Sequence, residues 1–512
     1  MKRRQRQLYL LDVLILGLLS LYVFLGRNAA PFHGDEATFV AMSRDYHELI
    51  YERNFAWFSY QELVPAQYDH VRLIRLTIGP ISYFTIGLAW DLSGFTVHDL
   101  NGLWGWTDDG AANTATYEIN RAQGNLPTQK LLRAARTPST LFLALSIVAV
   151  FSIAKRLTHS RLAAYAAALI YATTPAVLVN GQRAMQEGAM LLTTGLTASA
   201  AINVIEAQRQ QTKKKPVPVE WYAGLGVISG LALASKHPSL LVVAAAFLAV
   251  FLAPLLSRGE LEDGETPFDW RHICAVTGAA VTAMAIFCLL VPAWWSWGRL
   301  VILFGLASFL LSMGWARTGW RIWMVRGVAI LLAVTIGLMH PTLWSELAEL
   351  LRNTVGLRQA IGARHAADSG QLHSISQRLA FLSRQAFGAG PQYFEVAAWA
   401  GIEEIADQIA NYERSALAGR GGGIGWAASL GTLFAAGLWA FVTGRFERRG
   451  LFLALWLLLP VLALLALNSL PWQRYYLVLH APVAVFSGLG LWKIVHGMNV
   501  MRRKRSWGQR RP

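Results

Sequence analysis

The chain has 512 residues, of which 54% are hydrophobic and 15% are charged, and its formal net charge at pH 7 is +16. Soluble globular domains carry about 25% charged residues, so the composition excludes an ordinary soluble enzyme. The basic residues lie in short clusters between apolar runs, as they do in the cytoplasmic loops of membrane proteins. The charge therefore indicates membrane topology, and we expect no nucleic-acid partner.

The apolar runs predict membrane helices. They are continuous and near the length of a helical span, whereas the strands of a membrane β-barrel alternate over about 10 residues. The two cysteines, Cys274 and Cys288, lie in one such run, about 21 Å apart along a helix, and cannot form a disulfide. We predict an all-α polytopic membrane protein of about 12 transmembrane helices. The runs lie near residues 8–25, 138–155, 162–180, 185–205, 221–235, 239–255, 272–292, 299–313, 326–340, 426–443, 450–468 and 476–496.

One further apolar segment, residues 74–94, decides the orientation of every span that follows it. If it does not cross the membrane, the tight basic clusters all face the cytoplasm; if it crosses, they all face outward, against the positive-inside rule. We therefore expect a juxtamembrane helix along the outer interface. The first span is then uncleaved, both termini are cytoplasmic, and the protein is expected in the plasma (inner) membrane. The clusters are residues 155–161, 209–215, 258–271, 317–326, 445–449 and 502–511.

This topology divides the chain into three regions. Residues 1–340 are expected to form an N-terminal membrane bundle, whose first outer loop is residues 26–137. Residues 341–425 form a second outer region with polar helical stretches, which is either a lid over the acceptor or a structural cap. Residues 426–512 supply the last spans and a basic cytoplasmic tail. No Gly-rich loop followed by Lys-Ser or Lys-Thr is present, so nothing indicates an ATP-driven transporter.

Two adjacent acids follow the first span, in the segment Pro31–Glu36. Acidic side chains at the mouth of a membrane bundle are costly unless they are paired, hydrated or coordinated, so they are candidates for function. Asp35 has the chemistry of a general base, whereas Glu36 could orient a partner. Together with His33 they could also hold a divalent cation, although no ligand spacing requires one. In the alternative interpretation, both acids only stabilise the N-terminus of a helix over residues 37–50.

A further acid, Glu187, lies at the start of the fourth span, four residues after Arg183. Residues i and i+4 share one face of a helix, so we expect both side chains to face the same cavity as Asp35. In the alternative interpretation they form an internal ion pair that closes the hairpin between two spans.

Basic groups also lie at the outer ends of later spans. Lys236 and His237 interrupt two apolar runs, and Arg474 precedes the last span beside aromatic residues. An ammonium or guanidinium there can bind a phosphate. Snorkelling to lipid headgroups and an interfacial aromatic belt are the alternatives. Because these acids and cations come from separate segments but share one membrane face, they suit a transferase with a lipid-phosphate donor.

These residues lie within an ordered set of short motifs that resembles the GT-C membrane glycosyltransferases, in the branch of the protein O-mannosyltransferases and the lipid A aminoarabinose transferases. Asp35-Glu36 resembles the acidic pair of that family's first outer loop. The segment from Arg183 to Glu187 resembles its second acidic motif, where an aspartate is more usual. The set also includes Gly79–Phe84 with Leu92–Gly94, Arg136–Thr140, Gly230–Lys236, and Arg474–Leu477 with Pro482.

The resemblance implies a GT-C-type bundle with outer juxtamembrane helices and an outer helical cap. It also implies a polyprenyl-phosphate-linked sugar donor, inversion at the sugar carbon, and an active site at the outer leaflet. By the same resemblance, Asp35 is the base or the acid that orients it, Glu187 is the supporting carboxylate, and Lys236 and Arg474 contact the donor phosphate. The acceptor is a protein, a lipid or a polysaccharide. The further candidates for substrate binding are Arg183, His33, Tyr83, His237 and Arg75.

Two features depart from the family pattern. Ile78-Gly79 stand where the family has a lysine, so one phosphate contact must move to Arg75, Lys236 or water. Residues 95–130 are longer and more polar than the family pattern leads us to expect. Aromatic and acidic side chains there suit sugar recognition, although an insertion of unrelated role explains them as well. They are Trp104, Trp106, Asp108 and Asp109.

The function that we predict is therefore an inverting, carboxylate-assisted membrane glycosyltransferase. One alternative is a secondary transporter that uses the same acids as a proton relay. A transporter predicts acids near the bilayer midplane and inverted internal repeats, and the sequence suggests neither. Another alternative is a non-catalytic membrane protein that only binds the lipid carrier.

Overall fold

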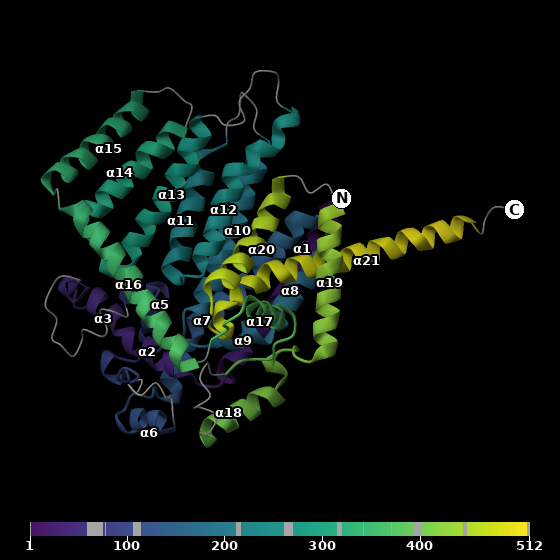
Figure 1. Cartoon of the computed structure of the whole chain (residues 1–512), viewed down its shortest axis with the longest axis horizontal. Helices are drawn as coiled ribbons and strands as arrows, with labels where there is room; N and C mark the ends of the chain where they lie inside the picture. Colours follow the sequence, from purple (N-terminus) through teal and green to yellow (C-terminus); the bar gives the residue numbers. More distant parts are fainter. Residues whose placement is uncertain are drawn as a thin grey trace.

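The computed structural model is helical throughout the residues that it describes (Figure 1). These are residues 2–58, 75–76, 78–105, 114–210, 217–260, 270–314, 320–340, 342–369, 371–393, 402–443 and 448–508. No β-strand occurs within those ranges. The prediction of an all-α polytopic membrane protein is confirmed.

Each predicted apolar run coincides with a helix or with a pair of helices. Of the helices in the described ranges, 9 are long and apolar enough to cross a membrane, and the count is 10 if the bent pair α8–α9 is one span. Two further apolar helices, within residues 219–235 and 326–339, are shorter. The helices that contain the runs are α1 (Lys2–Leu25), α7 (Gln129–Thr158), α8 (Arg161–Thr173), α9 (Pro175–Gln182), α10 (Glu187–Arg209), α11 (Val219–Ser235), α12 (Ser239–Leu252), α13 (Trp270–Leu290), α14 (Trp297–Gly314), α15 (Trp320–Met339), α19 (Ile424–Thr443), α20 (Arg448–Leu467) and α21 (His480–Gly508).

The long helices pack as a layered bundle. In Figure 1, α10, α11, α13, α14 and α15 lie side by side in this order, and neighbouring members of the series contact each other. Helix α7 contacts α1, α8 and α10, and α21 contacts α8 and α19. The apolar core therefore runs through α7, α8, α10 and α21, with the other spans around it.

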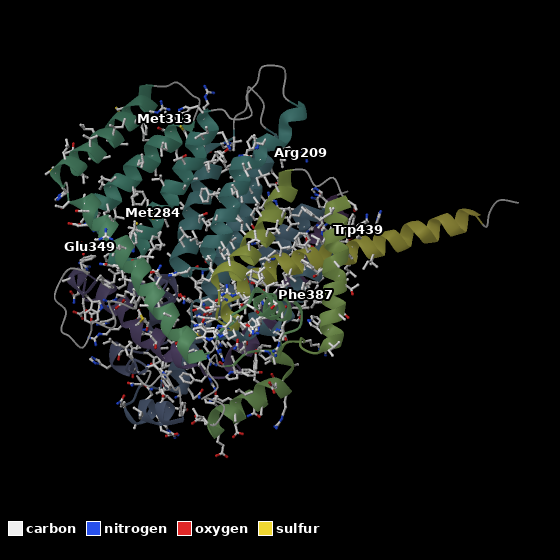
Figure 2. The ribbon with its side chains drawn as sticks, viewed as in Figure 1. Arg209, Met284, Met313, Glu349, Phe387 and Trp439 are labelled. Atoms are coloured by element: carbon white, nitrogen blue, oxygen red, sulfur yellow. The ribbon has the colours of Figure 1, made fainter. Side chains whose placement is uncertain are left out.

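The remaining helices gather at one end of the bundle, which we call the site end. Figure 2 shows nitrogen and oxygen atoms concentrated in this lower part of the molecule. Helix α5 has 13 residues, about 20 Å of helix, which is shorter than the roughly 30 Å hydrocarbon core of a bilayer. It begins at Pro80, and the expected segment 74–94 includes residues 74 and 77, which lie outside the described ranges. The helices of this end are α2 (Gly34–Met42), α3 (Arg44–Ile50), α5 (Pro80–Leu92), α6 (Thr114–Ala122), α16 (Leu343–Ser369), α17 (Ile375–Phe387) and α18 (Glu403–Arg414).

A bend between α8 and α9 brings polar residues to the site end. The two helices meet at an angle of 60°. Pro175 is the first residue of α9, and Thr174 before it is extended, because a proline disfavours helical backbone at the preceding residue. Every residue of α9 is buried, including Asn180 and Gln182. The bend therefore places two buried amides beside the residues discussed below.

Glycines allow α11 and α13 to approach closely. A Cβ atom on Gly226 or on Gly230 would lie 2.6 Å from the carbonyl oxygen of Ala279 or Ala283, respectively. Small residues at such spacing let helix backbones pack directly in membranes. The position of Lys236, just beyond the end of α11, therefore depends on a rigid helix pair.

A basic cluster lies at the opposite end of the bundle. Lys155 and Arg161 donate to the carboxylate of Asp12 on α1, at 2.9 and 3.1 Å. Along α7, Lys155 is about 28 Å from Arg136, which lies at the site end. One of the predicted basic clusters and the candidate site thus occupy opposite ends of the same helix.

Candidate active site

Asp35 faces Arg474, which follows 439 residues later in the chain. Helix α2 begins at Gly34 with His33 as its cap, and the Nδ1 atom of His33 accepts a hydrogen bond from the Asp35 N–H at 3.1 Å. The Asp35 carboxylate forms an ion pair with the Arg474 guanidinium, and the Asp35 side chain is 22% exposed. Asp35 therefore combines a charged partner with access from outside.

Glu187 and Lys236 form a second ion pair, which is more deeply buried. Glu187 is the first residue of α10, and Lys236 follows the end of α11 with extended backbone. Their side chains are 0% and 6% exposed. The second carboxylate oxygen of Glu187, Oε2, has no hydrogen-bond partner within the described ranges. Because a buried acceptor without a partner is costly, this oxygen can gain from binding a ligand.

Tyr475 connects the two ion pairs. The Lys236 ammonium lies 5.7 Å from the centre of the Tyr475 ring, and the Arg474 guanidinium lies 5.9 Å from the same centre. The Arg474 guanidinium also lies 4.9 Å from the centre of the Trp472 ring. The two ion pairs therefore form one continuous group of charges around Tyr475. We call this group the four-charge site; it consists of Asp35, Arg474, Lys236 and Glu187.

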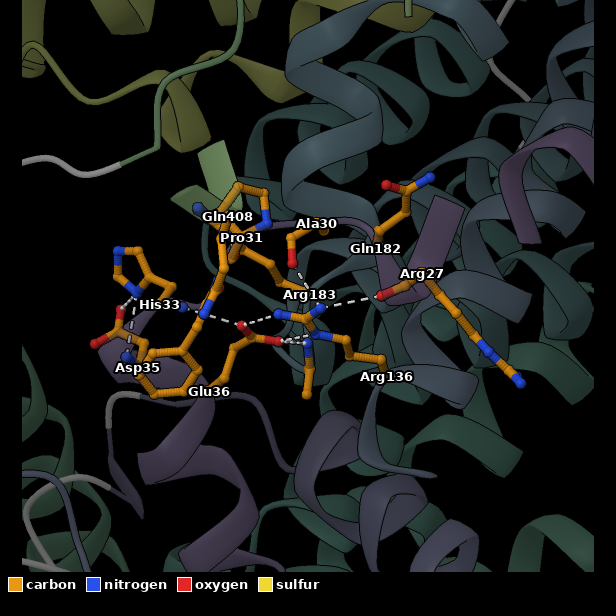
Figure 3. A network of polar contacts seen from close by, with 12 residues as sticks. Arg27, Ala30, Pro31, His33, Asp35, Glu36, Arg136, Gln182, Arg183 and Gln408 are labelled. Carbon is orange, nitrogen blue, oxygen red and sulfur yellow. Dashed lines mark hydrogen bonds and ion pairs between the residues drawn. The ribbon is translucent and has the colours of Figure 1, made fainter. Parts of the chain in front are cut away.

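Glu36 lies in a buried network that is joined to Asp35 through His33 (Figure 3). Its Oε1 atom accepts hydrogen bonds from the Arg136 guanidinium at 2.7 Å and from the Ala184 N–H at 2.8 Å. Its Oε2 atom accepts from Arg136 at 2.7 Å and from the His33 N–H at 3.1 Å. Burial acts to raise the pKa of the Glu36 carboxyl, but the charge and hydrogen bonds of Arg136 and the charge of Arg183 hold that pKa below its usual value.

The network favours a structural role for Glu36 over the predicted catalytic one. Both of its oxygens are occupied and its side chain is fully buried, so Glu36 cannot take a proton from a substrate without breaking these bonds. Neighbouring residues in a helix point in different directions, and here Asp35 faces the four-charge site while Glu36 faces the bundle. We propose that Glu36 positions the Asp35 loop.

Arg183 and Glu187 do not share a helical face, so that prediction is wrong. Helix α9 ends at Gln182, Arg183 has extended backbone, and α10 begins only at Glu187, so the i and i+4 relation does not apply. Arg183 is buried and donates to the carbonyl oxygens of Pro31 and Tyr393, at 3.2 and 2.8 Å. It therefore holds the Asp35 loop against the segment that follows α17.

Three other candidates lie outside the four-charge site. Arg75 forms a buried, two-pronged ion pair with Asp45 and also donates to the Trp57 carbonyl oxygen, so its guanidinium is engaged away from the four-charge site. The Tyr83 hydroxyl is buried without a hydrogen-bond partner in the described ranges, and burial raises its pKa well above the usual value. His237 adjoins Lys236, and its Nε2 atom also lacks a partner there.

The residues proposed for a divalent cation already contact protein groups. The Nδ1 atom of His33 accepts the Asp35 N–H, and Glu36 is saturated by its own donors. Among the described residues, no group of 3 or more His, Cys, Asp or Glu side chains is arranged to hold a metal ion. Of the polar insertion within residues 95–130, Trp104 packs on Phe32 in the site-end core, and Trp106, Asp108 and Asp109 lie outside the described ranges.

Residues 128–297 match the family model of the dolichyl-phosphate-mannose-protein mannosyltransferases. These residues are similar to that family. The match confirms the resemblance that the motifs indicated, over the part of the chain that it covers. Arg183, Glu187 and Lys236 lie within the matched residues, whereas Asp35 and Arg474 lie outside them on either side.

Among the solved structures with a similar arrangement are those of an archaeal oligosaccharyltransferase. The oligosaccharyltransferase AglB from Archaeoglobus fulgidus, in complex with an inhibitory peptide and a dolichol-phosphate, has 14% identity, a TM-score of 0.49, and coverage of 96% of this chain and 51% of that one. The apo form of an oligosaccharyltransferase from Archaeoglobus fulgidus has 13% identity, a TM-score of 0.46 and coverage of 96% and 51%. The chain thus spans about half the length of these structures. No curated protein matches the chain as a relative.

Two positioning residues of the site were not identified from the sequence. Gln473, which is buried, accepts hydrogen bonds from Asn180 and from the Gln392 N–H, at 3.3 and 3.0 Å, and donates to Gln385 and to the Gly390 carbonyl oxygen, at 3.0 and 2.9 Å. Its neighbour in the chain is Arg474. The sequence shows an amide side chain next to a candidate phosphate ligand. The partners of this amide on α9 and after α17 are visible only in the structure.

The second such residue is Gly79, where the family has a lysine. A Cβ atom at this position would lie 1.9 Å from the carbonyl oxygen of Ser235, the residue before Lys236. The Gly79 N–H donates to the Gln186 side chain at 3.2 Å. The start of α5 therefore packs directly against the end of α11 beside Lys236 and Glu187, and no side chain fits between them.

Replacing Gln473 with leucine is expected to lower the stability of the protein. Leucine makes none of the four hydrogen bonds, so Arg474 loses the anchor beside it, and each buried partner left unsatisfied costs about 1–3 kcal/mol. We expect a lower midpoint of thermal unfolding than for the control Gln371→Leu, at an exposed position. Equal midpoints for the two variants would contradict it.

Replacing Gly79 with alanine is expected to destabilise the site end. The added methyl meets backbone atoms of Ser235, which cannot move aside like the end of a flexible side chain, and overpacking of this kind costs about 1–3 kcal/mol. The matched control is Gly224→Ala, since a Cβ on that α11 residue meets no atom within 4 Å. Thermal unfolding of the purified protein should show a lower midpoint for Gly79→Ala than for Gly224→Ala; equal midpoints would refute the close approach.

Proposed function

We propose that the chain is an inverting membrane glycosyltransferase. It transfers a sugar from a polyprenyl-phosphate-linked donor to an acceptor at the outer face of the membrane. The observation that carries this proposal is the four-charge site, in which a reachable carboxylate and two cations meet beside the residues that match the mannosyltransferase family. The match supports lipid-linked donor chemistry, and the charges supply the groups that such chemistry requires.

Asp35 is the general base in this mechanism. Its carboxylate accepts the proton from the hydroxyl or amine of the acceptor as the acceptor atom attacks the anomeric carbon of the sugar. The ion pair with Arg474 holds the Asp35 carboxylate in place before the reaction. His33 holds the backbone of Asp35 at the start of α2, and the Glu36–Arg136 network fixes the loop behind it.

Lys236 and Arg474 stabilise the leaving phosphate. As the new bond forms, the bond between the anomeric carbon and the phosphate oxygen breaks, and the electron pair leaves with the polyprenyl phosphate. Attack opposite to that bond gives inversion. The two cations approach the same Tyr475 ring, so one phosphate group can bind between them. Glu187 holds the Lys236 ammonium in place.

The outer location of the site is supported by charge distribution. The basic cluster that includes Lys155 and Arg161 lies at the end of the bundle opposite the four-charge site. Basic residues favour the cytoplasmic side of a membrane protein, so the site end faces outward. We place both termini in the cytoplasm on the same argument.

The test is transfer of a labelled sugar by the purified chain in proteoliposomes. Polyprenyl-phosphate-linked sugars are supplied with peptide, lipid and polysaccharide acceptors, and both labelled product and released polyprenyl phosphate are measured. We expect the two products in equal amounts with one class of acceptor. Flux of solute across the vesicle membrane without sugar transfer would instead favour a transporter and would reject the proposal.

A further inference from the structure

A cavity separate from the four-charge site opens beside α14 and α16. Its volume is about 640 Å³, and it lies between the phenylalanines Phe55 and Phe58, the loop and helix start at residues 292–300, and one face of α16. Glu349, on α16, is labelled in Figure 2 at the edge of the molecule. None of the residues that line the cavity belongs to the four-charge site.

The polar lining of this cavity carries both signs of charge. The Arg299 guanidinium forms an ion pair with Glu346 at 3.0 Å, and the Arg299 side chain is 10% exposed. The Nε atom of Arg299 is buried and has no hydrogen-bond partner in the described part of the chain. Glu349 is exposed, one turn further along α16. The lining thus offers an unsatisfied guanidinium donor and, nearby, a carboxylate open to a cation.

An apolar groove continues from the cavity along the bundle. The groove has a volume of about 480 Å³ and runs between α14 and α15 to Met324 and Leu332. Leu289, Trp297 and Leu300 line both the cavity and the groove, so the two are continuous. The groove is lined by side chains from α13 and α14, which are candidate membrane spans, and from the apolar helix α15, and the polar cavity lies at one end of it.

The position of Trp297 relates this arrangement to the depth of a bilayer. Trp297 is 85% exposed and is the first residue of α14, a candidate span. Tryptophan at the end of a span is typical of the level of the lipid headgroups. The charged cavity therefore lies at headgroup depth, and the apolar groove lies at the depth of the acyl chains.

We propose that the cavity and groove bind a zwitterionic phospholipid of the bilayer, with an ammonium headgroup such as that of phosphatidylethanolamine. The lipid phosphate binds the Nε donor of Arg299, the ammonium binds Glu349, and one acyl chain fills the groove. Charge complementarity selects this occupant. Two carboxylates against one guanidinium disfavour a lipid with net negative charge, whereas the zwitterion satisfies both signs.

This site is distinct from the proposed donor site. A polyprenyl-phosphate donor carries only negative charge near its headgroup. It suits Lys236 and Arg474, which both approach the Tyr475 ring. The carboxylates of Glu187 and Asp35 are the ion-pair partners of these two cations. The phospholipid site contributes a fixed lipid contact between α14, α15 and α16. Its existence does not depend on sugar transfer.

Competitive lipid binding to the purified full-length chain tests the proposal. Phosphatidylethanolamine and phosphatidylglycerol with the same acyl chains are offered in equal amounts, and the lipids bound are counted by native mass spectrometry. We expect a preference for phosphatidylethanolamine. Glu349→Lys should reduce the ratio of bound phosphatidylethanolamine to phosphatidylglycerol about fivefold, the upper effect of an exposed ion pair.

Two further variants make the outcome decisive. Glu403→Lys makes the same charge change at an exposed position on α18 and should leave the ratio unchanged. Val328→Trp, at an exposed groove residue, should fill the groove and lower binding of both lipids. The proposal is overturned if the wild-type protein shows no preference, or if Glu349→Lys and Glu403→Lys give the same ratio.

Discussion

Replacing Asp35 with asparagine is expected to lower the rate of sugar transfer by a factor of about 10²–10⁴, the usual contribution of a general base. Asparagine has the same shape as aspartate but cannot accept the acceptor's proton. Folding should be nearly unchanged, because the Asp35 N–H that bonds to His33 remains and the side chain is partly exposed. The measurement is single-turnover transfer at saturating donor, together with the unfolding midpoint.

A matched control separates the base from its neighbours. Asp91→Asn removes another site-end carboxylate, one that accepts hydrogen bonds from the hydroxyls of Tyr46 and Tyr51 at 2.9 Å and lies outside the four-charge site. Its transfer rate should stay within about threefold of wild type, a loss below 1 kcal/mol in the activation free energy. A normally folded Asp35→Asn enzyme with the wild-type rate would remove Asp35 from the mechanism.

Replacing Arg136 with leucine is expected to cause the largest loss of stability. It leaves the Glu36 carboxylate buried without the guanidinium that binds both of its oxygens, and breaking a buried ion pair from one side costs about 3–5 kcal/mol. The Asp35 loop should loosen as well, since Arg136 also donates to the carbonyl oxygens of Arg27 and Ala30. Thermal unfolding in detergent and the yield of folded protein measure the effect.

The double variant Glu36→Leu/Arg136→Leu provides the control, because removing both partners of a buried pair costs less than removing one. We expect it to unfold at a higher temperature than Arg136→Leu alone. The pH dependence has a defined sign: since the folded-state pKa of Glu36 is lowered, the pair stabilises the protein above the usual carboxyl pKa and the stabilisation is lost as the pH falls through the lowered value. An Arg136→Leu protein as stable as wild type would refute the structural role.

Local sequence information was sufficient to predict the spans and to group the charged residues at one end of the bundle. Continuous apolar runs predicted each helix of the bundle, because the bilayer fixes the length and composition of a spanning segment. Motif order indicated the mannosyltransferase family, and the match over residues 128–297 confirms it there. Asp35, Lys236 and Arg474 were assigned to one membrane face from charge alone, and the structure brings them together.

The pairing of these side chains could not be predicted from the sequence. Glu36 meets Arg136 after 100 residues, and Asp35 meets Arg474 after 439, so neither pair follows from local spacing. The expected Arg183–Glu187 arrangement failed because the chain leaves the helix after Gln182, and periodicity cannot reveal such a break within a continuous apolar pattern. Tertiary contacts bury the Glu36 carboxylate and leave the Asp35 carboxylate partly exposed.

The central claim is that the donor phosphate binds between Lys236 and Arg474, next to Asp35. A structure of the protein with a non-hydrolysable polyprenyl-phosphate sugar analogue in a lipid nanodisc tests it most directly. The account predicts phosphate oxygens within hydrogen-bond distance of both cations, and the anomeric carbon on the side of Asp35. A phosphate bound at Arg75 or in the cavity beside Arg299, with the four-charge site unoccupied, would contradict it.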